Sequence, residues 1–374
     1  MNQAELNALL DKSFTIPIVI RLDTFPNNTP YVQLNNLENG FTFTPRELLH
    51  AIGSKTAALP ANNSDECVNS AYLYTHILDF EGENIGYKPD LIMDSDLQTN
   101  RSNEIGIGMG CLIANKLFNV NWDTLESLKG QGKRFDYRAT VPGQNYAYEF
   151  KGTKHRGKQK EQIDNGLDKK VDMHERGEGY DVELIISTHL GTSEQIPRIV
   201  LADPPFGGFE NEFSDEADIF YHLRHLARLS QFIGNTRLAR LYYNESKKYS
   251  SKKRIDELNQ AVYQNILPLE TPLYLGNIIS INVEDKNFVG RWVDAWHPRS
   301  KKGKSFQIPQ LSKEGKLEIF QGVTRELYQL MISNDILKIR DIPKFEQMKM
   351  KTVNNIDFNI FSDGTVMAYR FRKD

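Results

Sequence analysis

Residues 135–153 read FDYRATVPGQNYAYEFKGT, and this stretch predicts a β-hairpin with an acidic residue on each arm. The turn lies between Val141 and Gln144, because the intervening proline presets φ and the glycine accepts a positive φ. If Val141 pairs with Gln144, the same register places Asp136 opposite Glu149. Opposed strand residues have Cβ atoms about 5 Å apart, so two carboxylates there repel each other unless they share a bound cation.

The second arm of the hairpin alternates between charged and aromatic side chains. A period of two puts Glu149 and Lys151 on one face and the aromatic side chains on the other. The aromatic face can be buried while the charged face lines a cleft. The register decides this interpretation, because a slip by one residue would move Asp136 to the opposite face from Glu149. Type II turns rarely close two-residue hairpins, so a solvated hairpin with ordinary surface charges is the alternative.

The composition is that of an ordinary soluble globular protein. The chain has 374 residues and a formal net charge of −3, so any affinity for nucleic acid has to come from local basic patches. Its two cysteines, Cys67 and Cys111, exclude a cysteine-built metal site and suggest a reducing compartment. The N-terminus lacks the pattern of a signal peptide, and no stretch has the apolar length of a membrane span. We therefore expect a cytoplasmic protein without membrane contact.

The order of the predicted elements divides the chain into four segments. Residues 1–98 are expected to form an accessory α/β region, and residues 99–205 a core that contains the hairpin. Residues 206–267 are expected to be helical, and residues 268–374 to form a β-rich C-terminal region.

Within the core, helices and strands alternate in a recognisable order. Ser102 or Asn103 can cap a helix that reaches Phe118 before the hairpin begins. A helix and two buried strands are expected after the hairpin, at residues 158–174, 182–187 and 198–202. This α-β-β-α-β order predicts a mixed sheet flanked by helices.

At these residues the chain resembles the PD-(D/E)xK nuclease superfamily, which includes restriction endonucleases and phage exonucleases. Glu149-Phe-Lys-Gly152 is similar to the Glu-x-Lys-Gly ending of its motif, and Phe135-Asp136 takes the place of its Pro-Asp pair. The chain departs from the family in having no proline before Asp136 and no tyrosine four residues after Gln162, which weakens a placement in the exonuclease-like branch. The resemblance covers roughly residues 100–205 and implies a restriction-endonuclease-like mixed sheet.

The resemblance also implies roles for five side chains. Asp136 and Glu149 would hold Mg²⁺, or alternatively Mn²⁺, with Glu104 from the preceding helix as a further ligand. Such a metal polarises a phosphate and lowers the pKa of a bound water. Lys151 would orient that water or neutralise developing charge, and Gln162 matches a polar residue that many members place near the site. We therefore expect a metal-dependent endonuclease or exonuclease.

A basic run directly follows the hairpin. Its cationic side chains include Lys154, Arg156, Lys158 and Lys160. Because this run leaves the candidate site where a phosphate backbone would pass, we expect it to contact nucleic acid, with DNA favoured; a solvated helix face is the ordinary alternative. The resemblance further implies a role in bacterial restriction or antiphage defence, and it leaves open a helicase or ATPase partner and a homo-oligomer.

Two rival functions stay open at this point. One is a non-catalytic nucleic-acid or protein-binding module that keeps the nuclease fold. The other is a DNA amino-methyltransferase, because Asp203-Pro-Pro-Phe206 resembles the Asp-Pro-Pro-(Tyr/Phe) motif of those enzymes, and the alternate glycines Gly106, Gly108 and Gly110 resemble a nucleotide-binding loop. Such a loop should follow an apolar strand, whereas polar residues come first here, and close packing of the glycines against a sheet is the other explanation.

Overall fold

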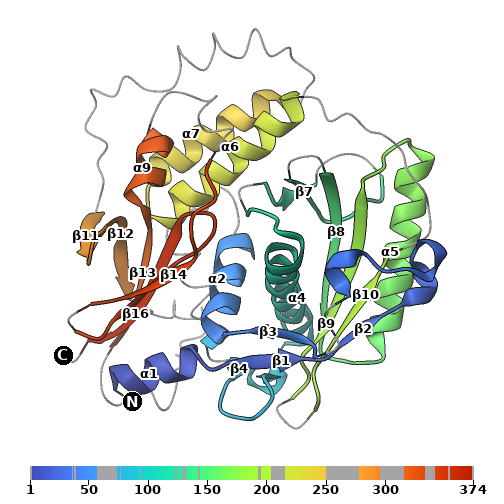
Figure 1. The fold of residues 1–374 in the computed structure, drawn as a ribbon, viewed down its shortest axis with the longest axis horizontal. Coiled ribbons are helices and arrows are strands. Elements are labelled where there is room, and N and C mark those ends of the chain that lie inside the picture. Colours follow the sequence, from blue (N-terminus) through green and yellow to red (C-terminus); the bar gives the residue numbers. More distant parts are fainter. Residues whose placement is uncertain are drawn as a thin grey trace. The chain divides into compact units, whose positions relative to one another are not determined.

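The computed structural model describes most of the chain (Figure 1). The described residues are 2–35, 37, 39–56, 74–75, 77–92, 94–122, 124–128, 132–141, 144–192, 195–203, 215–249, 278–294, 316–332, 342–352 and 354–372. They form a mixed α/β structure. None of the helices among them combines the length and the apolar character that crossing a membrane requires.

The chain divides into two compact units. The unit that carries the hairpin, which we call the hairpin unit, comprises Leu9–Thr56 and Leu73–Glu212. The terminal unit comprises Met1–Ala8, Ala57–Tyr72 and Phe213–Asp374. This division differs from the four segments expected from the sequence, because an N-terminal strand joins the same sheet as the hairpin.

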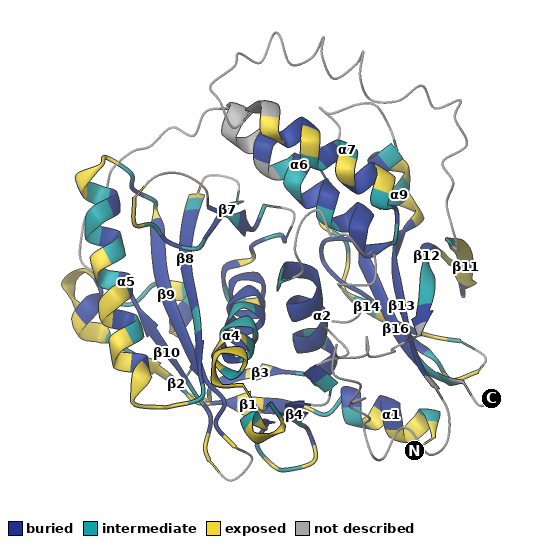
Figure 2. Cartoon of the chain, turned by 180° about the vertical axis from the view of Figure 1, so that it is seen from behind, coloured by how far each residue is buried: buried dark blue, intermediate teal, exposed yellow. Residues whose placement is uncertain are grey.

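The described strands of the hairpin unit build a six-stranded sheet. In spatial order they are β2 (Ile18–Ile20), β10 (Arg198–Ala202), β9 (Val182–His189), β8 (Gln144–Thr153), β7 (Tyr137–Val141) and β6 (Glu126–Ser127). β8 is parallel to β9 and β2 is parallel to β10, whereas the other neighbours are antiparallel. β8 and β9 lie in the interior of the sheet and are largely buried, as Figure 2 shows, so the strand that carries Glu149 and Lys151 is held along both edges.

The hairpin has the register that the sequence predicts. Val141 pairs with Gln144, and Tyr137 pairs with Tyr148. Asp136 directly precedes the first residue of β7, so this register brings it to the level of Glu149 on β8. The two turn residues, 142 and 143, lie outside the described residues.

Two helices cover opposite faces of this sheet (Figure 1). α4 (Ser95–Phe118) lies on the aromatic face, and α5 (Lys158–Glu175) lies on the charged face of β8, where its Gly166 packs on Ile185 of β9. α2 (Pro45–Thr56) packs in turn on α4.

α4 begins earlier than the sequence predicts. Asp94 caps the helix, and its Oδ1 accepts hydrogen bonds from the backbone N–H groups of Asp96 and Leu97 at 2.9 Å each. Ser102 and Asn103 therefore lie inside the helix, and their prediction as caps was wrong. The first turns of α4 are mostly exposed and polar, so they carry none of the apolar periodicity by which a helix is recognised in a sequence.

The alternate glycines lie in the interior of α4 and allow close packing. A Cβ at Gly106 would lie 2.2 Å from the backbone nitrogen of Gly152, and a Cβ at Gly110 would lie 2.3 Å from the ring of Phe150. Gly108 faces α2 at a similarly short distance. The packing explanation is confirmed, and the nucleotide-binding loop of the methyltransferase interpretation is not formed by these residues, which are helical.

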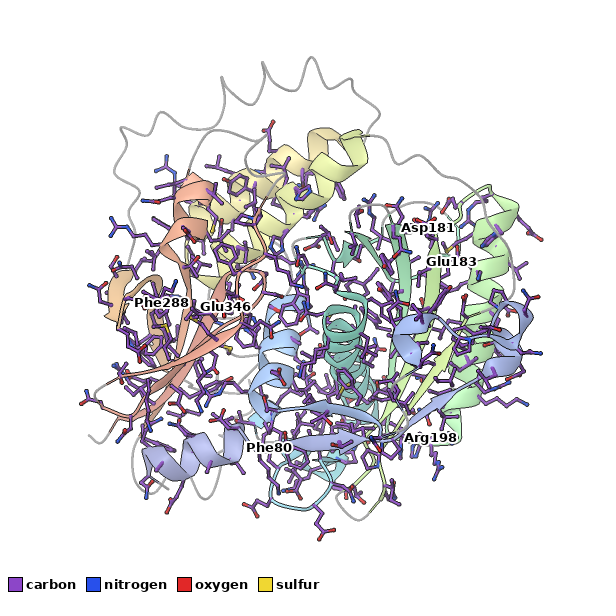
Figure 3. The ribbon with its side chains drawn as sticks, viewed as in Figure 1. Phe80, Asp181, Glu183, Arg198, Phe288 and Glu346 are labelled. Carbon is purple, nitrogen blue, oxygen red and sulfur yellow. The ribbon has the colours of Figure 1, made fainter. Side chains whose placement is uncertain are left out.

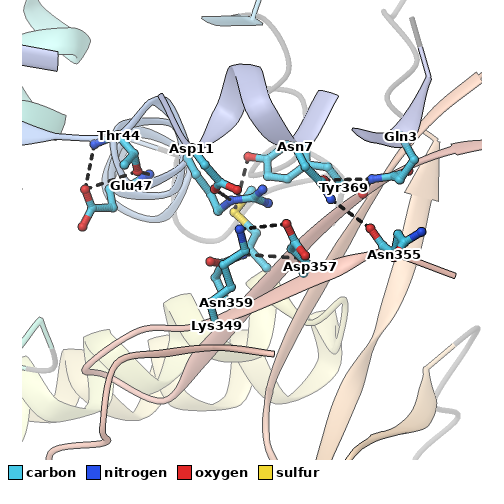
Figure 4. Close-up of polar contacts among 12 residues, drawn as sticks. Gln3, Asn7, Asp11, Thr44, Glu47, Lys349, Asn355, Asp357, Asn359 and Tyr369 are labelled. Carbon is cyan, nitrogen blue, oxygen red and sulfur yellow. Dashed lines mark hydrogen bonds and ion pairs between the residues drawn. The ribbon is translucent and has the colours of Figure 1, made fainter. Parts of the chain in front are cut away.

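Smaller elements complete the hairpin unit. Two short antiparallel pairs join β1 (Phe14–Ile16) to β3 (Phe41–Phe43) and β4 (Leu78–Asp79) to β5 (Gly86–Tyr87). Single 3-10 turns lie at Leu22–Thr24, Pro26–Asn28, Val32–Leu34 and Pro89–Leu91. A reciprocal capping box opens α2, because the Thr44 backbone N–H donates to Glu47 Oε2 at 2.8 Å and the Glu47 backbone N–H donates to Thr44 Oγ1 at 3.3 Å (Figure 4).

The terminal unit contains a second, antiparallel sheet. Its described strands, in spatial order, are β11 (Ile279–Val283), β12 (Lys286–Asp294), β13 (Lys316–Thr324), β16 (Thr365–Arg372), β15 (Asp357–Ile360) and β14 (Met348–Lys351). Its described helices include α6 (Asp215–Phe232), α7 (Thr236–Tyr249) and α9 (Arg325–Ile332). The start of α1 (Gln3–Leu10) is tied to this sheet, because Gln3 Nε2 donates to the Tyr369 carbonyl at 2.8 Å and Asn7 Nδ2 donates to the Asn355 carbonyl at 2.9 Å (Figure 4).

Candidate active site

Four charged side chains meet on the face of β8 that α5 covers. Lys151 Nζ lies 2.8 Å from Asp136 Oδ2 and 2.8 Å from Glu149 Oε1. Lys169 of α5 reaches the same two carboxylates, with Nζ 2.6 Å from Glu149 Oε1 and 3.3 Å from Asp136 Oδ1. The predicted proximity of Asp136, Glu149 and Lys151 is therefore observed.

The cluster is buried at one end and open at the other. Glu149 is completely buried (0% exposed), whereas the Asp136 side chain is 33% exposed. Burial raises the pKa of Glu149, and the charge of Asp136 adds to this effect, while Lys151 and Lys169 oppose it. Burial by itself would lower the pKa of Lys151, but Glu149 and Asp136 outweigh it and raise that pKa. The site thus confines two negative and two positive charges beside solvent.

The donor atoms of this cluster fit a divalent cation. Among the described residues, Glu149 Oε2 is buried without a hydrogen-bond partner, so one oxygen of the buried carboxylate is left for a ligand. Within the same residues, no group of three or more His, Cys, Asp and Glu side chains is arranged to hold a metal. Mg²⁺ is commonly bound by one or two carboxylates, with waters and substrate phosphates completing its shell. Asp136 and Glu149 supply two carboxylates, of which both Asp136 oxygens and Glu149 Oε1 are paired with lysine ammonium groups.

Glu104, the third acid expected from the sequence, has other partners. It accepts a hydrogen bond from Arg101 Nη1 at 2.6 Å and a further one from the Tyr74 hydroxyl. Burial raises the pKa of Tyr74 well above its usual range, and the neighbouring Glu104 carboxylate adds to the shift. Glu104 belongs to α4, on the opposite face of the sheet from α5, and the structure does not bring it into a group with Asp136 and Glu149.

Gln162 connects α5 to the two central strands. Its Nε2 donates to the Gly152 carbonyl at 3.0 Å, and its Oε1 accepts from Ser187 Oγ at 2.7 Å. These contacts hold the helix against β8 directly after Lys151. Gln162 therefore supports the cluster from the side, through Gly152 and Ser187 and not through the two carboxylates.

Lys169 is the member of the cluster that the sequence analysis missed. It follows Gln162 by seven residues, which is two helical turns, so both side chains lie on the face of α5 that meets the sheet. Gly166 and Met173 lie on the same face and are buried. The spacing of these residues was the available sequence signal that Lys169 faces the sheet, but a charged side chain on a helix is ordinarily expected to be solvated.

A second, buried ion cluster fixes the far part of α5. Lys170 Nζ lies 2.8 Å from Glu183 Oε2 and 2.8 Å from Asp203 Oδ1. His174 Nε2 lies 2.8 Å from the same Glu183 oxygen, and the Tyr31 hydroxyl bonds to Asp203. Burial raises the pKa of Asp203, and Lys170 opposes that shift. Asp203, which the methyltransferase interpretation needs, is thus a buried structural anion, and residues 204–206 of that motif lie outside the described residues.

The expected nucleic-acid contacts spread over the start of α5. Lys158 and Lys160 are exposed, and Lys158 forms a surface ion pair with Glu161 at 3.2 Å. Lys154 and Arg156 instead line a surface hollow at the end of β8. The basic run therefore separates into a solvated part and a part that shapes a concave surface.

Comparisons of the chain with protein-family models, with curated proteins and with solved structures gave no match.

Proposed function

We propose that this chain is a metal-dependent nuclease of the PD-(D/E)xK superfamily, with a restriction-endonuclease-like core and DNA as its favoured substrate. The observation that carries the proposal is the convergence of Asp136, Glu149 and Lys151 on one face of the central strand. The buried oxygen Glu149 Oε2, which lacks a partner among the described residues, adds to it.

In this proposal Asp136 and Glu149 hold Mg²⁺ or Mn²⁺, and when bound the metal polarises the scissile phosphate and lowers the pKa of a coordinated water. Lys151, whose Nζ lies 2.8 Å from each carboxylate, orients the attacking water or neutralises charge that develops on the phosphate. Lys169 supplies a second ammonium group from α5. Gln162 keeps α5 in place beside Lys151.

The wider biological role follows from the same proposal. A nuclease of this class would act in the cytoplasm in bacterial restriction or antiphage defence. The terminal unit would then position the substrate or a partner protein, such as a helicase or an ATPase, and self-association into a homo-oligomer is compatible with this role.

A second candidate function rests on a specific observation. Both carboxylates of the cluster are already paired with ammonium groups, and Glu104 is engaged elsewhere. A protein of this fold that had lost catalysis would keep such a neutralised cluster and bind nucleic acid or another protein without cleaving it.

One assay separates the two functions. The purified full chain is incubated with Mg²⁺ or Mn²⁺ and with linear, circular and single-stranded DNA and RNA, beside Glu149→Ala and Glu149→Gln. We expect cleavage by the wild type and a loss of at least about 10²-fold in both variants, because the buried metal ligand is removed. Glu175→Gln, which changes an exposed glutamate at the end of α5, is the matched control.

Cleavage that persists undiminished in Glu149→Ala would refute the assignment of the site. Binding without cleavage, unchanged in the same variant, would instead establish the non-catalytic module.

A further inference from the structure

A basic hollow opens on the hairpin unit beyond the charged cluster. It has a volume of about 630 Å³ and lies where β8 and β9 end and α5 begins. Its lining residues are Lys154, His155, Arg156, Gly157, His189, Gln195 and Ile196. No carboxylate belongs to this lining among the residues that the structure describes.

Positive charge is concentrated around this hollow without a compensating acid. Arg156 is exposed, and among the described residues it has no ion-pair partner. Arg198, at the start of β10, donates from Nε to the neutral Gln159 Oε1 at 2.9 Å. Burial lowers the pKa of Arg198, and the charge of Arg156 lowers it further, so the two guanidinium groups are close enough to repel each other. Figure 3 places Arg198 at the opposite end of the strands from Glu183, away from the buried ion cluster.

His189 lines the hollow and has a buried ring nitrogen without a hydrogen-bond partner among the described residues. The residue is 2% exposed, and its Nδ1 is buried with no hydrogen-bond partner in the described part of the chain. Burial lowers the pKa of His189, and the nearby charges of Arg156, Arg198 and His155 lower it further, while a hydrogen bond to the Lys154 backbone acts in the opposite direction. An unpartnered buried nitrogen costs free energy that a bound hydrogen-bonding ligand would recover.

The start of α5 adds a third attraction for an anion. Gly157 is the N-cap of this 18-residue helix and provides no side-chain cap, and the space where its Cβ would lie is open within 4 Å. The N-terminus of a helix carries a partial positive charge. The first two N–H groups of α5, on Lys158 and Gln159, donate to the carbonyls of His155 and Arg156, so the attraction here is that of the helix dipole.

We propose that the hollow is a phosphate-binding subsite in which Arg156, Lys154, His189 and the N-terminus of α5 hold one phosphate group of a nucleic-acid strand. The phosphate would be either an internal diester or the monoester at a strand end, and both present the same anionic oxygens. This inference rests on the proposed nuclease function for the identity of the strand. Lys154 follows Lys151 by three residues, so their Cα atoms are at most about 10 Å apart, and the subsite lies next to the scissile position along the strand.

The subsite is tested by phosphate binding to the full chain in the absence of divalent metal. Inorganic phosphate is titrated into protein labelled at its histidine rings, and the His189 signal, assigned with His189→Asn, is followed by NMR. We expect a saturable shift of this signal, and a loss of affinity of about tenfold or more in Arg156→Gln, because a charge-assisted hydrogen bond is removed. Arg176→Gln, which removes one charge at the other end of α5, should bind phosphate as the wild type does.

The titration is repeated with short single strands that carry either a phosphate or a hydroxyl at the 5′ end. Tighter binding of the phosphorylated strand identifies the monoester, and equal binding of both strands, weakened in Arg156→Gln, identifies an internal diester. A His189 signal that does not shift, or an equal loss in Arg156→Gln and Arg176→Gln with native circular dichroism in both, would overturn the subsite.

The failure of this inference can be told apart from the failure of the proposed function. Phosphate binding in a chain that cleaves no nucleic acid would remove the nuclease proposal and leave the subsite. Cleavage by a chain whose His189 signal does not respond to phosphate would remove the subsite and leave the nuclease proposal.

Discussion

Replacing Lys169 by methionine probes the charge balance of the candidate active site. The substitution keeps an unbranched side chain of similar length and removes the ammonium group that lies 2.6 Å from Glu149 Oε1 and 3.3 Å from Asp136 Oδ1. Glu149 would remain completely buried, with Lys151 as its remaining cation in this cluster.

The magnitude follows from these contacts. Breaking a buried ion pair costs about 3–5 kcal/mol, but Lys169 is 24% exposed and Lys151 stays 2.8 Å from the same carboxylate oxygen. We therefore expect the free energy of unfolding to fall by about 1–3 kcal/mol, as for the loss of one hydrogen bond to a charged group. For a unit of this size each kcal/mol corresponds to about 2–4 °C in melting temperature.

Divalent metal should reverse this loss. If Mg²⁺ binds as proposed, it competes with two ammonium groups for Asp136 and Glu149 in the wild type and with one in Lys169→Met. Thermal unfolding with and without Mg²⁺ should therefore show a larger metal-induced rise in the variant than in the wild type.

The matched control is Lys158→Met on the same helix. Lys158 and Glu161 are 59% and 61% exposed, so losing their pair should cost at most about 0.5 kcal/mol. A Lys169→Met protein that melts like the wild type, or that gains no more from Mg²⁺ than the wild type gains, would refute the view that Lys169 neutralises a metal site.

Three further substitutions test the surrounding structure. Gly106→Ala should lower the free energy of unfolding by about 1–3 kcal/mol, because its Cβ would meet the backbone of β8. Gly157→Ala, at an open helix N-cap, should instead raise the free energy of unfolding by about 0.4–1 kcal/mol. Equal effects of the two substitutions in urea unfolding would contradict the packing explanation. Burial lowers the pKa of His50 to about 3. Between about pH 6.5 and pH 3 the unfolded chain therefore binds a proton at this residue and the folded chain does not. The free energy of unfolding should fall by about 1.4 kcal/mol for each unit by which the pH is lowered across this range. His50→Phe should remove this part of the slope, and a wild type with the same pH profile as the variant would disprove the assignment. Lys170→Met leaves Asp203 buried without its cation and should cost about 3–5 kcal/mol in urea unfolding, while a loss under 1 kcal/mol would show that the buried cluster does not fix α5.

The hairpin shows how far local rules extend. The position of the turn and the two-residue period of a strand limit the register to few choices, and the pairing of Val141 with Gln144, which the turn type left open, is the one observed. The start of α4 shows where they stop, because the exposed polar turns after Asp94 have no apolar stripe, and the capping bonds that mark the true start appear only in three dimensions.

The sequence by itself determined that Glu149 and Lys151 share a face, and it predicted that Asp136 joins them if Val141 pairs with Gln144, which is the register observed. Only the tertiary structure decided which distant side chains join them. α5 packs on the charged face and adds Lys169, whereas α4 packs on the aromatic face and keeps Glu104 with Arg101. The face that a helix covers depends on contacts between residues far apart in the chain, and these contacts leave no periodic trace within either helix alone.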